Sequence, residues 1–239
     1  MHKLESQIEK KEKNNRIFGL DILRAFAILV VVIEHGNYLL SEKKAEVISS
    51  LFGYDGVSIF FVLSGFLIGG ILIKTLEKKQ DRKHTLLNFW IRRWCRTIPN
   101  YFLILIVLLT LNLLFNDDFN LGKRTIVLFF TFTQNLFYEH PTFFSEAWSL
   151  SIEEWFYLLI PPIIMVFMFF KRNVKTSVLY TAISILIIIT LYRFYRYSNI
   201  PAESLTDFSV LKWDMQFRKQ VITRLDSLMF GVIGAFLQY

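Results

Sequence analysis

Long apolar runs constrain this chain more than any other feature. Seven runs approach the ~20 residues that an α-helix needs to cross the hydrocarbon core of a bilayer. Hydrophobic residues make up 54% of the chain, and the mean hydropathy is +0.41. These values disfavour a water-soluble globule and exclude collagen, coiled coil and intrinsic disorder. The sequence therefore predicts an all-α, polytopic membrane helix bundle with spans at 17–40, 54–73, 100–115, 125–138, 155–170, 177–192 and 220–239.

Some of these runs have irregular features. The run 125–138 is short for a span, and a re-entrant segment is the alternative interpretation. Pro161 and Pro162 lie in the run 155–170 and are expected to kink or break a helix there. Gly65 and Gly69 form a small-xxx-small pair, which predicts close packing against another helix.

The basic residues predict the direction of the chain across the membrane. The charged tail, residues 1–16, has no apolar core and is not a cleavable signal peptide. This tail and the segment Lys74–Arg96, which carries eight Lys or Arg residues, are expected in the cytoplasm. The remaining residues, 17–239, then form a multi-pass domain of the inner (plasma) membrane. The last run stops at Tyr239, so we expect the domain to be incomplete at its C-terminus.

Two later segments conflict with this direction if every run crosses the membrane. The basic loop Lys171–Lys175 would lie outside, and the acidic stretch 139–154 would lie inside. Both placements oppose the usual distribution of Lys and Arg. A re-entrant segment at 125–138 would remove the conflict.

Ionisable residues interrupt the first apolar run. Arg24 and His35 are eleven residues apart, which places them about 20° apart around a helix and ~16 Å apart along it. Asp21 lies one turn before Arg24 and can hold its guanidinium group. Such residues in a membrane helix usually face a protein interior or a water-filled cavity, so a polar channel is predicted. The alternative is a neutralised Asp21–Arg24 pair at one edge and an interfacial His35.

Arginines and tryptophans cluster before the third run. Arg92, Arg93 and Arg96 occur in the sequence RRWCRTIP, and Arg93 and Arg96 stand one helical turn apart. Guanidinium groups there can bind a phosphorylated ligand bidentately. They can also anchor the helix end against anionic lipid.

The acidic segment 145–162 supplies a carboxylate candidate. Glu153 or Glu154 would be drawn into the membrane by the apolar residues that follow, which makes one of them a site candidate. The alternative is that Ser149 or Ser151 caps the helix while the two carboxylates favour its N-terminus.

The remaining ionisable residues give no metal site. His84 and His140 are interpreted as solvated or interfacial, with no metal-ligand spacing to other residues. Arg224 and Asp226 form a further charged pair at the start of the last run. The single cysteine excludes an internal disulfide, and the sequence has no nucleotide-binding, nucleophile-elbow or zinc-protease motif. The net charge of +7 flanks apolar runs and forms no continuous stripe, so a nucleic-acid partner is not predicted.

Together these segments resemble the acyltransferase 3 family of integral-membrane O-acyltransferases, which modify bacterial surface sugars and related acceptors. The resemblance runs in the family's order from about Ile17 to the end. The resemblance implies a bundle of about ten spans, of which this chain would contain about seven. The matching segments are GLDILRAFAILVVVIEH (19–35), GVSIFFVLSGFLIG (56–69), FWIRRWCRTIP (89–99), AWSLSIEEWFYLLIPP (147–162) and ITRLDSLMFGVIGAFL (222–237).

The resemblance implies roles for individual residues. Arg24 and His35 carry the family's Arg-x10-His motif, and Arg93 and Arg96 carry its Arg-x-x-Arg motif. His35 is then the catalytic general base, with Glu153 as a second catalytic candidate. The three arginines bind acetyl-CoA or another acyl-CoA, which is a substrate and not a permanently bound cofactor. The acceptor is a hydroxyl of a cell-surface carbohydrate or glycolipid, within a membrane-lipid environment.

A transporter or a structural membrane subunit is the competing interpretation. Intramembrane Asp, Arg and His residues would then form a proton or ion path. The basic, tryptophan-rich segment before the third run exceeds what a transport path needs, and the two halves of the chain show no inverted repeat.

Overall fold

A computed structural model describes residues 17–36, 55–78, 82–171, 173–200 and 209–239. The chain divides into two compact units, Met1–Leu63 and Ser64–Tyr239. The predicted cytoplasmic tail, residues 1–16, lies outside the described residues.

The first unit contains helix α2 (Phe18–Gly36) and the first turns of helix α4 (Gly56–Glu77). Ala27 and Val30 of α2 are buried. Gly56 packs against the same face, because a Cβ atom on Gly56 would lie 2.9 Å from the Ala27 carbonyl oxygen and 2.8 Å from Val31 Cγ2. The absence of a side chain at Gly56 therefore permits the close approach of α4 to α2.

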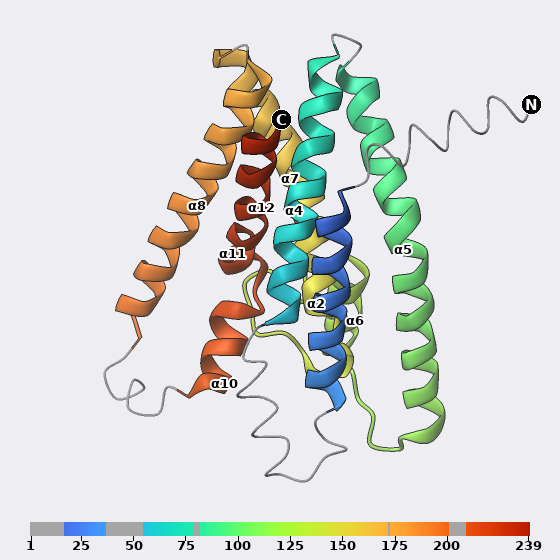
Figure 1. Ribbon diagram of the computed structural model, residues 1–239. Coiled ribbons are helices and arrows are strands. Elements are labelled where there is room, and N and C mark those ends of the chain that lie inside the picture. The colour runs from blue at the N-terminus through green and yellow to red at the C-terminus, as the bar shows by residue number, and fades with distance from the viewer. Residues whose placement is uncertain (1–16, 37–54, 79–81, 172, 201–208) are drawn as a thin grey trace, which may run out of the picture. The chain divides into compact units, whose positions relative to one another are not determined.

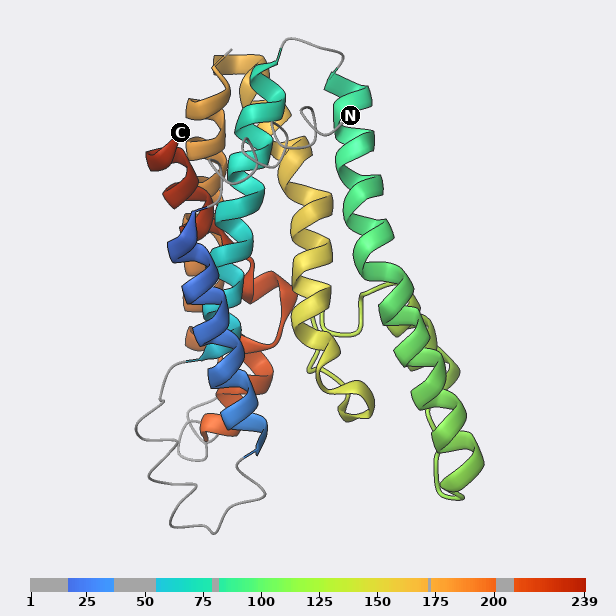
Figure 2. The same cartoon turned by 45° about the vertical axis from the view of Figure 1, so that its right-hand side comes forward.

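The second unit contains the rest of α4 and all later elements (Figures 1 and 2). Helices α7, α8 and α12 lie side by side in it. The described residues include no strand, which confirms the predicted all-α class. The later elements are α5 (Arg82–Phe115), α6 (Lys123–Phe130), η2 (Thr142–Phe144), α7 (Ala147–Lys171), α8 (Val174–Ser198), α10 (Val210–Trp213), the π-helical turn η3 (Asp214–Arg218), α11 (Val221–Arg224) and α12 (Asp226–Gln238).

Five described segments are long and apolar enough to cross a membrane: Gly56–Glu77, His84–Phe115, Ala147–Phe170, Val174–Ser198 and Val221–Gln238. Many large apolar side chains on them are exposed, including Phe169 and Leu191. Exposed apolar side chains are stable against lipid hydrocarbon. A helix can enter this environment because its backbone hydrogen bonds are made within the helix. The prediction of a polytopic membrane helix bundle is confirmed.

Glycines allow α4 to approach α12 closely, as the small-xxx-small pair predicts. A Cβ atom on Gly65 would lie 1.9 Å from the Leu228 carbonyl oxygen. A Cβ atom on Gly69 would lie 3.1 Å from Ala235 Cβ. Packing between backbones replaces the hydrophobic driving force that helices lack inside a bilayer.

The predicted span at 125–138 is wrong. Helix α6 ends at Phe130, and Phe132 follows with a positive φ of 56°. The helix ends in a Schellman motif, in which the Thr133 N–H donates to the Leu128 carbonyl oxygen at 2.9 Å and the Phe132 N–H donates to the Phe129 carbonyl oxygen at 3.3 Å. The segment is instead held by buried contacts, including a 2.9 Å hydrogen bond from Tyr101 Oη to the Phe129 carbonyl oxygen.

The run predicted to begin at residue 100 is the second half of a longer helix. Helix α5 has 34 residues and continues through Pro99. At 1.5 Å per residue it is ~51 Å long, which exceeds the ~30 Å hydrocarbon core. The arginine cluster therefore lies within a continuous helix and not in a loop before it.

The expected break at Pro161 and Pro162 is also absent, because α7 continues through both. Pro161 has no N–H, so the Tyr157 carbonyl loses its helical donor. Trp90 of α5 supplies the missing donor, since its indole Nε1 lies 2.8 Å from that carbonyl oxygen. The alternative of a cap at Ser149 or Ser151 is wrong, because α7 already begins at Ala147.

Candidate active site

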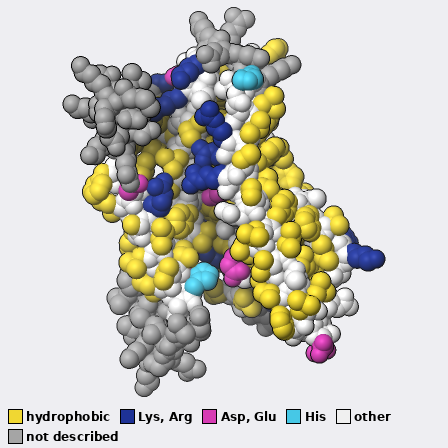
Figure 3. All heavy atoms as spheres, turned by 90° about the vertical axis from the view of Figure 1, so that its right-hand side faces the viewer, with side chains coloured by type: hydrophobic (Ala, Val, Ile, Leu, Met, Phe, Trp, Pro, Cys, Tyr) yellow, Lys and Arg dark blue, Asp and Glu magenta, His cyan; other side chains and the backbone are white. Residues whose placement is uncertain are grey.

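A basic cavity of about 590 Å³ lies between the C-terminal end of α4 and the N-terminal part of α5. Arg92, Arg93 and Arg96 recur at the spacing that places residues on one side of a helix, so all three contribute to its wall. In the space-filling view, Lys and Arg side chains gather in a hollow bordered by apolar surface (Figure 3). The rest of the polar lining consists of Thr75, Lys78, His84, Thr85 and Asn88.

Arg93 connects the cavity to a polar group on α7. Its guanidinium group lies 6.0 Å from the centre of the Phe89 ring and interacts electrostatically with Tyr157 and Glu153. Tyr157 Oη donates a 3.1 Å hydrogen bond to Glu153 Oε2. Ser64 Oγ of α4 lies 3.5 Å from Tyr157 Oη. A cation, a carboxylate and two hydroxyl groups from three helices therefore meet beside the cavity.

The second carboxylate of the pair has a different environment. Glu154 is buried and accepts a 2.6 Å hydrogen bond from Thr97 Oγ1 of α5. Glu153 is only half-buried. This arrangement assigns Glu154 to the contact between α5 and α7 and leaves Glu153 on the side of Arg93.

The polar stripe predicted on the first span is present on α2, in the other unit. Arg24 Nη1 lies 3.1 Å from Asp21 Oδ1, which confirms the predicted pair. His35 is exposed, and its Nδ1 lies 2.9 Å from the Val31 carbonyl oxygen. A carbonyl oxygen only accepts hydrogen bonds, so Nδ1 carries the proton and Nε2 is the basic nitrogen.

The structure brings three of the predicted site residues together within the second unit. Arg93 and Arg96 line one cavity, and Glu153 interacts with Arg93. Arg24 and His35 share one helix of the first unit. Sequence reasoning missed the roles of Trp90 and Thr97 in joining α5 to α7. The sequence did hold a signal for the Trp90 contact. A proline inside a helix leaves one carbonyl without its helical donor, and a side chain from another helix can replace that donor.

One other interpretation needs correction. His140 was expected to be solvated or interfacial but is only 4% exposed. The carboxylate of Asp226, whose role the sequence left open, binds Arg193 of α8 at 2.7 Å. His84 is exposed, as predicted.

Metal-ligating side chains do not gather in the described part of the chain. No group of three or more His, Cys, Asp or Glu residues there is arranged to hold a metal ion.

The fold defines a multi-pass membrane protein, and the basic cavity defines a site suited to an anionic ligand. A family model described as an acyltransferase domain matches residues 17–239. The chain therefore belongs to the acyltransferase 3 family, which confirms the resemblance seen in the sequence.

Named relatives are O-acetyltransferases. The chain is 34% identical over 169 residues to the peptidoglycan O-acetyltransferase OatA of Listeria monocytogenes, an alignment that covers 66% of this chain and 25% of the relative. It is 31% identical over 244 residues to the O-acetyltransferase OatA of Staphylococcus aureus, covering 97% of this chain and 36% of the relative. The chain thus spans about a quarter to a third of the length of these relatives. No solved structure matches it.

Proposed function

We propose that this chain is the membrane part of an O-acetyltransferase that moves an acetyl group from cytoplasmic acetyl-CoA to a hydroxyl of a cell-surface carbohydrate. The observation that carries the proposal is the basic cavity, whose Arg93 interacts with Tyr157 and Glu153. Family membership and the names of the relatives support the same reaction.

The donor would bind by its phosphates. Arg93 and Arg96 offer forked donors to phosphate oxygens in the cavity, and Lys78 adds a further positive charge. Arg24, which Asp21 fixes in the first unit, is proposed as a further donor-binding residue because it carries the family's Arg-x10-His motif. CoA carries its phosphates at one end and its thioester at the other, so binding through the phosphates leaves the acetyl group free to extend.

His35 would act as the general base. Its Nε2 removes the proton from the acceptor hydroxyl while the hydroxyl oxygen attacks the thioester carbonyl. The C–O bond forms, the C–S bond breaks, and the proton passes from His35 to the departing CoA thiolate. The ~16 Å along α2 between Arg24 and His35 suits a donor and an acceptor that approach from opposite ends.

Glu153 would assist by electrostatics. Its carboxylate is oriented by Tyr157, at 3.1 Å, and interacts electrostatically with the Arg93 guanidinium. A fixed carboxylate can stabilise the positive charge that a general base acquires during transfer. Glu153 is therefore proposed as the second catalytic residue.

The corrected element at 125–138 removes a conflict from the orientation in which the loop between α4 and α5 is cytoplasmic, and the N-terminus is then cytoplasmic as well if the run 17–40 crosses the membrane. If α6 does not cross the membrane, α7 enters from outside and α8 returns from the cytoplasm. The basic Lys171–Lys175 loop then lies in the cytoplasm and the acidic 139–154 stretch lies outside, which agrees with the distribution of charge in membrane proteins. The basic cavity at the α4–α5 end would open to the cytoplasm, where acetyl-CoA is found.

The experiment that tests donor binding is thermal unfolding of the full chain in detergent micelles with and without CoA. We expect CoA to raise the melting temperature, and S-acetylpantetheine, which lacks the phosphates of the nucleotide end, to have a much weaker effect. Arg93→Gln or Arg96→Gln should weaken CoA binding about tenfold, as for the loss of one charge-assisted hydrogen bond. Arg124→Gln, an exposed change on α6, is the matched control.

Two results would contradict the proposal. One is a melting temperature that does not respond to CoA at saturating concentration. The other is equal CoA affinity in wild type, Arg93→Gln and Arg96→Gln. Either result would favour the transporter interpretation.

A further inference from the structure

A second cavity lies at the other end of the second unit, in the region of α10 and the C-terminal half of α8 (Figure 1). Its volume is about 420 Å³, within the usual range of small-molecule sites. The wall consists of three arginines, Arg193, Arg218 and Arg224, and four aromatic residues, Phe194, Tyr197, Trp213 and Phe217. None of the mechanism proposed above uses this cavity.

Arg193 is held rigidly in the wall. Its two terminal nitrogens bind the two oxygens of Asp226, at 2.7 Å and 2.8 Å. It also donates to the Thr223 carbonyl oxygen. This two-pronged contact fixes the plane of the guanidinium group.

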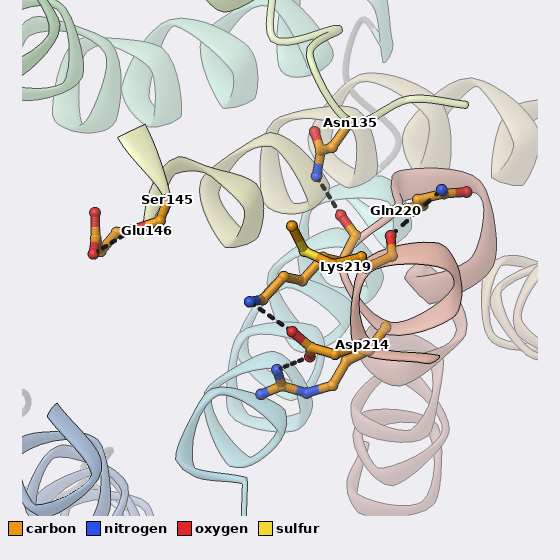
Figure 4. A network of polar contacts seen from close by, with 8 residues as sticks. Asn135, Ser145, Glu146, Asp214, Lys219 and Gln220 are labelled. Atoms are coloured by element: carbon orange, nitrogen blue, oxygen red, sulfur yellow. Dashed lines mark hydrogen bonds and ion pairs between the residues drawn. The ribbon is translucent and has the colours of Figure 1, made fainter. Parts of the chain in front are cut away.

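Arg218 is held by a second carboxylate. Asp214 lies 2.6 Å from Arg218 Nη1 and 2.6 Å from Lys219 Nζ (Figure 4). Burial opposes ionisation of Asp214, but the hydrogen bonds from Lys219 and Arg218 outweigh it and lower the pKa of the carboxyl group. The Arg218 guanidinium also lies 5.1 Å from the Trp148 ring centre. The cation is thus pre-oriented before any ligand arrives.

The chain around Lys219 is anchored to the loop after α6. Asn135 Nδ2 donates to the Lys219 carbonyl oxygen at 2.7 Å and to the Trp148 carbonyl oxygen at 3.0 Å. The Val221 N–H donates to the Asn135 carbonyl oxygen at 2.9 Å. The cavity wall is therefore part of a fixed scaffold and not of a free surface loop.

Aromatic rings form a larger part of the wall here than in the basic cavity. Trp213 is 45% exposed and Phe217 is 7% exposed, so one ring is accessible while the other is part of the core. The Arg196 guanidinium lies 5.2 Å from the centre of the Phe217 ring. Flat rings beside fixed cations are suited to a ligand that has both an apolar face and an acidic group.

We propose that this cavity binds the acceptor, a pyranose ring that carries a carboxylate or phosphate. The C–H face of the sugar packs on Trp213 and Tyr197, and the acidic group binds the arginines. The role as acceptor site rests on the proposed function. In the orientation inferred above, the cavity lies at the outer end of the helices and the donor cavity at the inner end.

The test is ligand binding measured by saturation-transfer NMR on the full chain in nanodiscs of phosphatidylcholine. The probes are methyl β-D-glucuronoside, methyl β-D-glucoside and glucose 6-phosphate. We expect both charged sugars to bind about tenfold more tightly than the neutral one, as for one charge-assisted contact. Trp213→Ala should weaken binding of every sugar, while Arg224→Gln should reduce the preference for charged over neutral sugars. Phe137→Ala, at another exposed aromatic residue, is the matched control.

Three results would overturn the proposal. The first is equal affinity for glucuronoside and glucoside in the wild type. The second is unchanged binding in both Trp213→Ala and Arg224→Gln. The third is complete loss of sugar binding when the nanodiscs contain phosphatidylglycerol, which would identify a lipid headgroup site. The assay contains no donor, so a failure here is distinct from a failure of CoA to stabilise the protein.

Discussion

Buried His140 predicts a specific loss of stability in mild acid. The ring lies edge-on to Phe129, with 5.8 Å between ring centres and an 82° angle, and its Nε2 has no hydrogen-bond partner among the described residues. Burial lowers the pKa of His140 to about 4, and the positive charge of Lys219 acts in the same direction. The backbone at Pro141 and the carboxylate of Glu146 oppose the shift without reversing it.

The magnitude follows from the two pKa values. An unfolded histidine has a pKa of about 6.5, so the unfolded chain binds more protons than the folded protein between pH ~4 and ~6.5. The contribution of neutral His140 is therefore fully present above pH ~6.5 and declines as the pH falls towards ~4. At pH 5 the loss is about 2 kcal/mol relative to pH 8.

The assay is unfolding by sodium dodecyl sulfate in mixed micelles at pH 8 and pH 5, comparing wild type with His140→Phe. Phenylalanine keeps an aromatic ring in the site but removes the titrating nitrogens, so the free energy of unfolding should fall about 2 kcal/mol less between these pH values. The carboxylates titrate in both proteins and cancel in the comparison. His84→Phe, at an exposed histidine, is the control. Equal losses in wild type and His140→Phe would refute the reasoning.

Two packing predictions concern helix contacts. Gly65→Ala should destabilise the protein by more than ~2 kcal/mol in the same unfolding assay, because its Cβ atom would overlap a carbonyl oxygen of α12; Gly19→Ala, with open space around it, is the control, and equal effects would refute the packing argument. Trp90→Phe should cost about 1–3 kcal/mol by leaving the Tyr157 carbonyl unsatisfied. This cost should shrink in a Pro161→Ala background, where a backbone N–H returns, and additive effects of the two changes would contradict it.

Much of the fold could be predicted because hydrocarbon imposes a simple length rule. The apolar runs around α4, α8 and α12 are continuous, and the Gly65–Gly69 spacing identifies a contact face without knowledge of the partner. The rule failed at 125–138 because hydropathy does not register the left-handed conformation of Phe132, which ends the helix, or the hydrogen bonds of Asn135, which tie the loop to distant segments. Such tertiary contacts have no local signal.

The site could be predicted in part because ionisable residues in a membrane segment are costly and usually functional. The regular spacing of Arg93 and Arg96 was sufficient to place them on one wall. The partners of Arg193 and Asp226 lie on different helices, so no spacing rule could pair them. His140 was misread because a histidine beside a proline in a polar sequence is ordinarily solvated, and only the surrounding aromatic residues bury it.

The central claim is that the chain transfers acetyl groups from acetyl-CoA through His35. The most direct measurement is transfer of radiolabelled acetyl from acetyl-CoA in membranes from cells expressing the full-length gene product. Wild type, His35→Ala, Arg93→Ala and the control His84→Ala would be compared at equal protein level. We predict that label accumulates in the membrane fraction with wild type and His84→Ala and is lost in the other two variants. Unchanged labelling in His35→Ala would contradict the account.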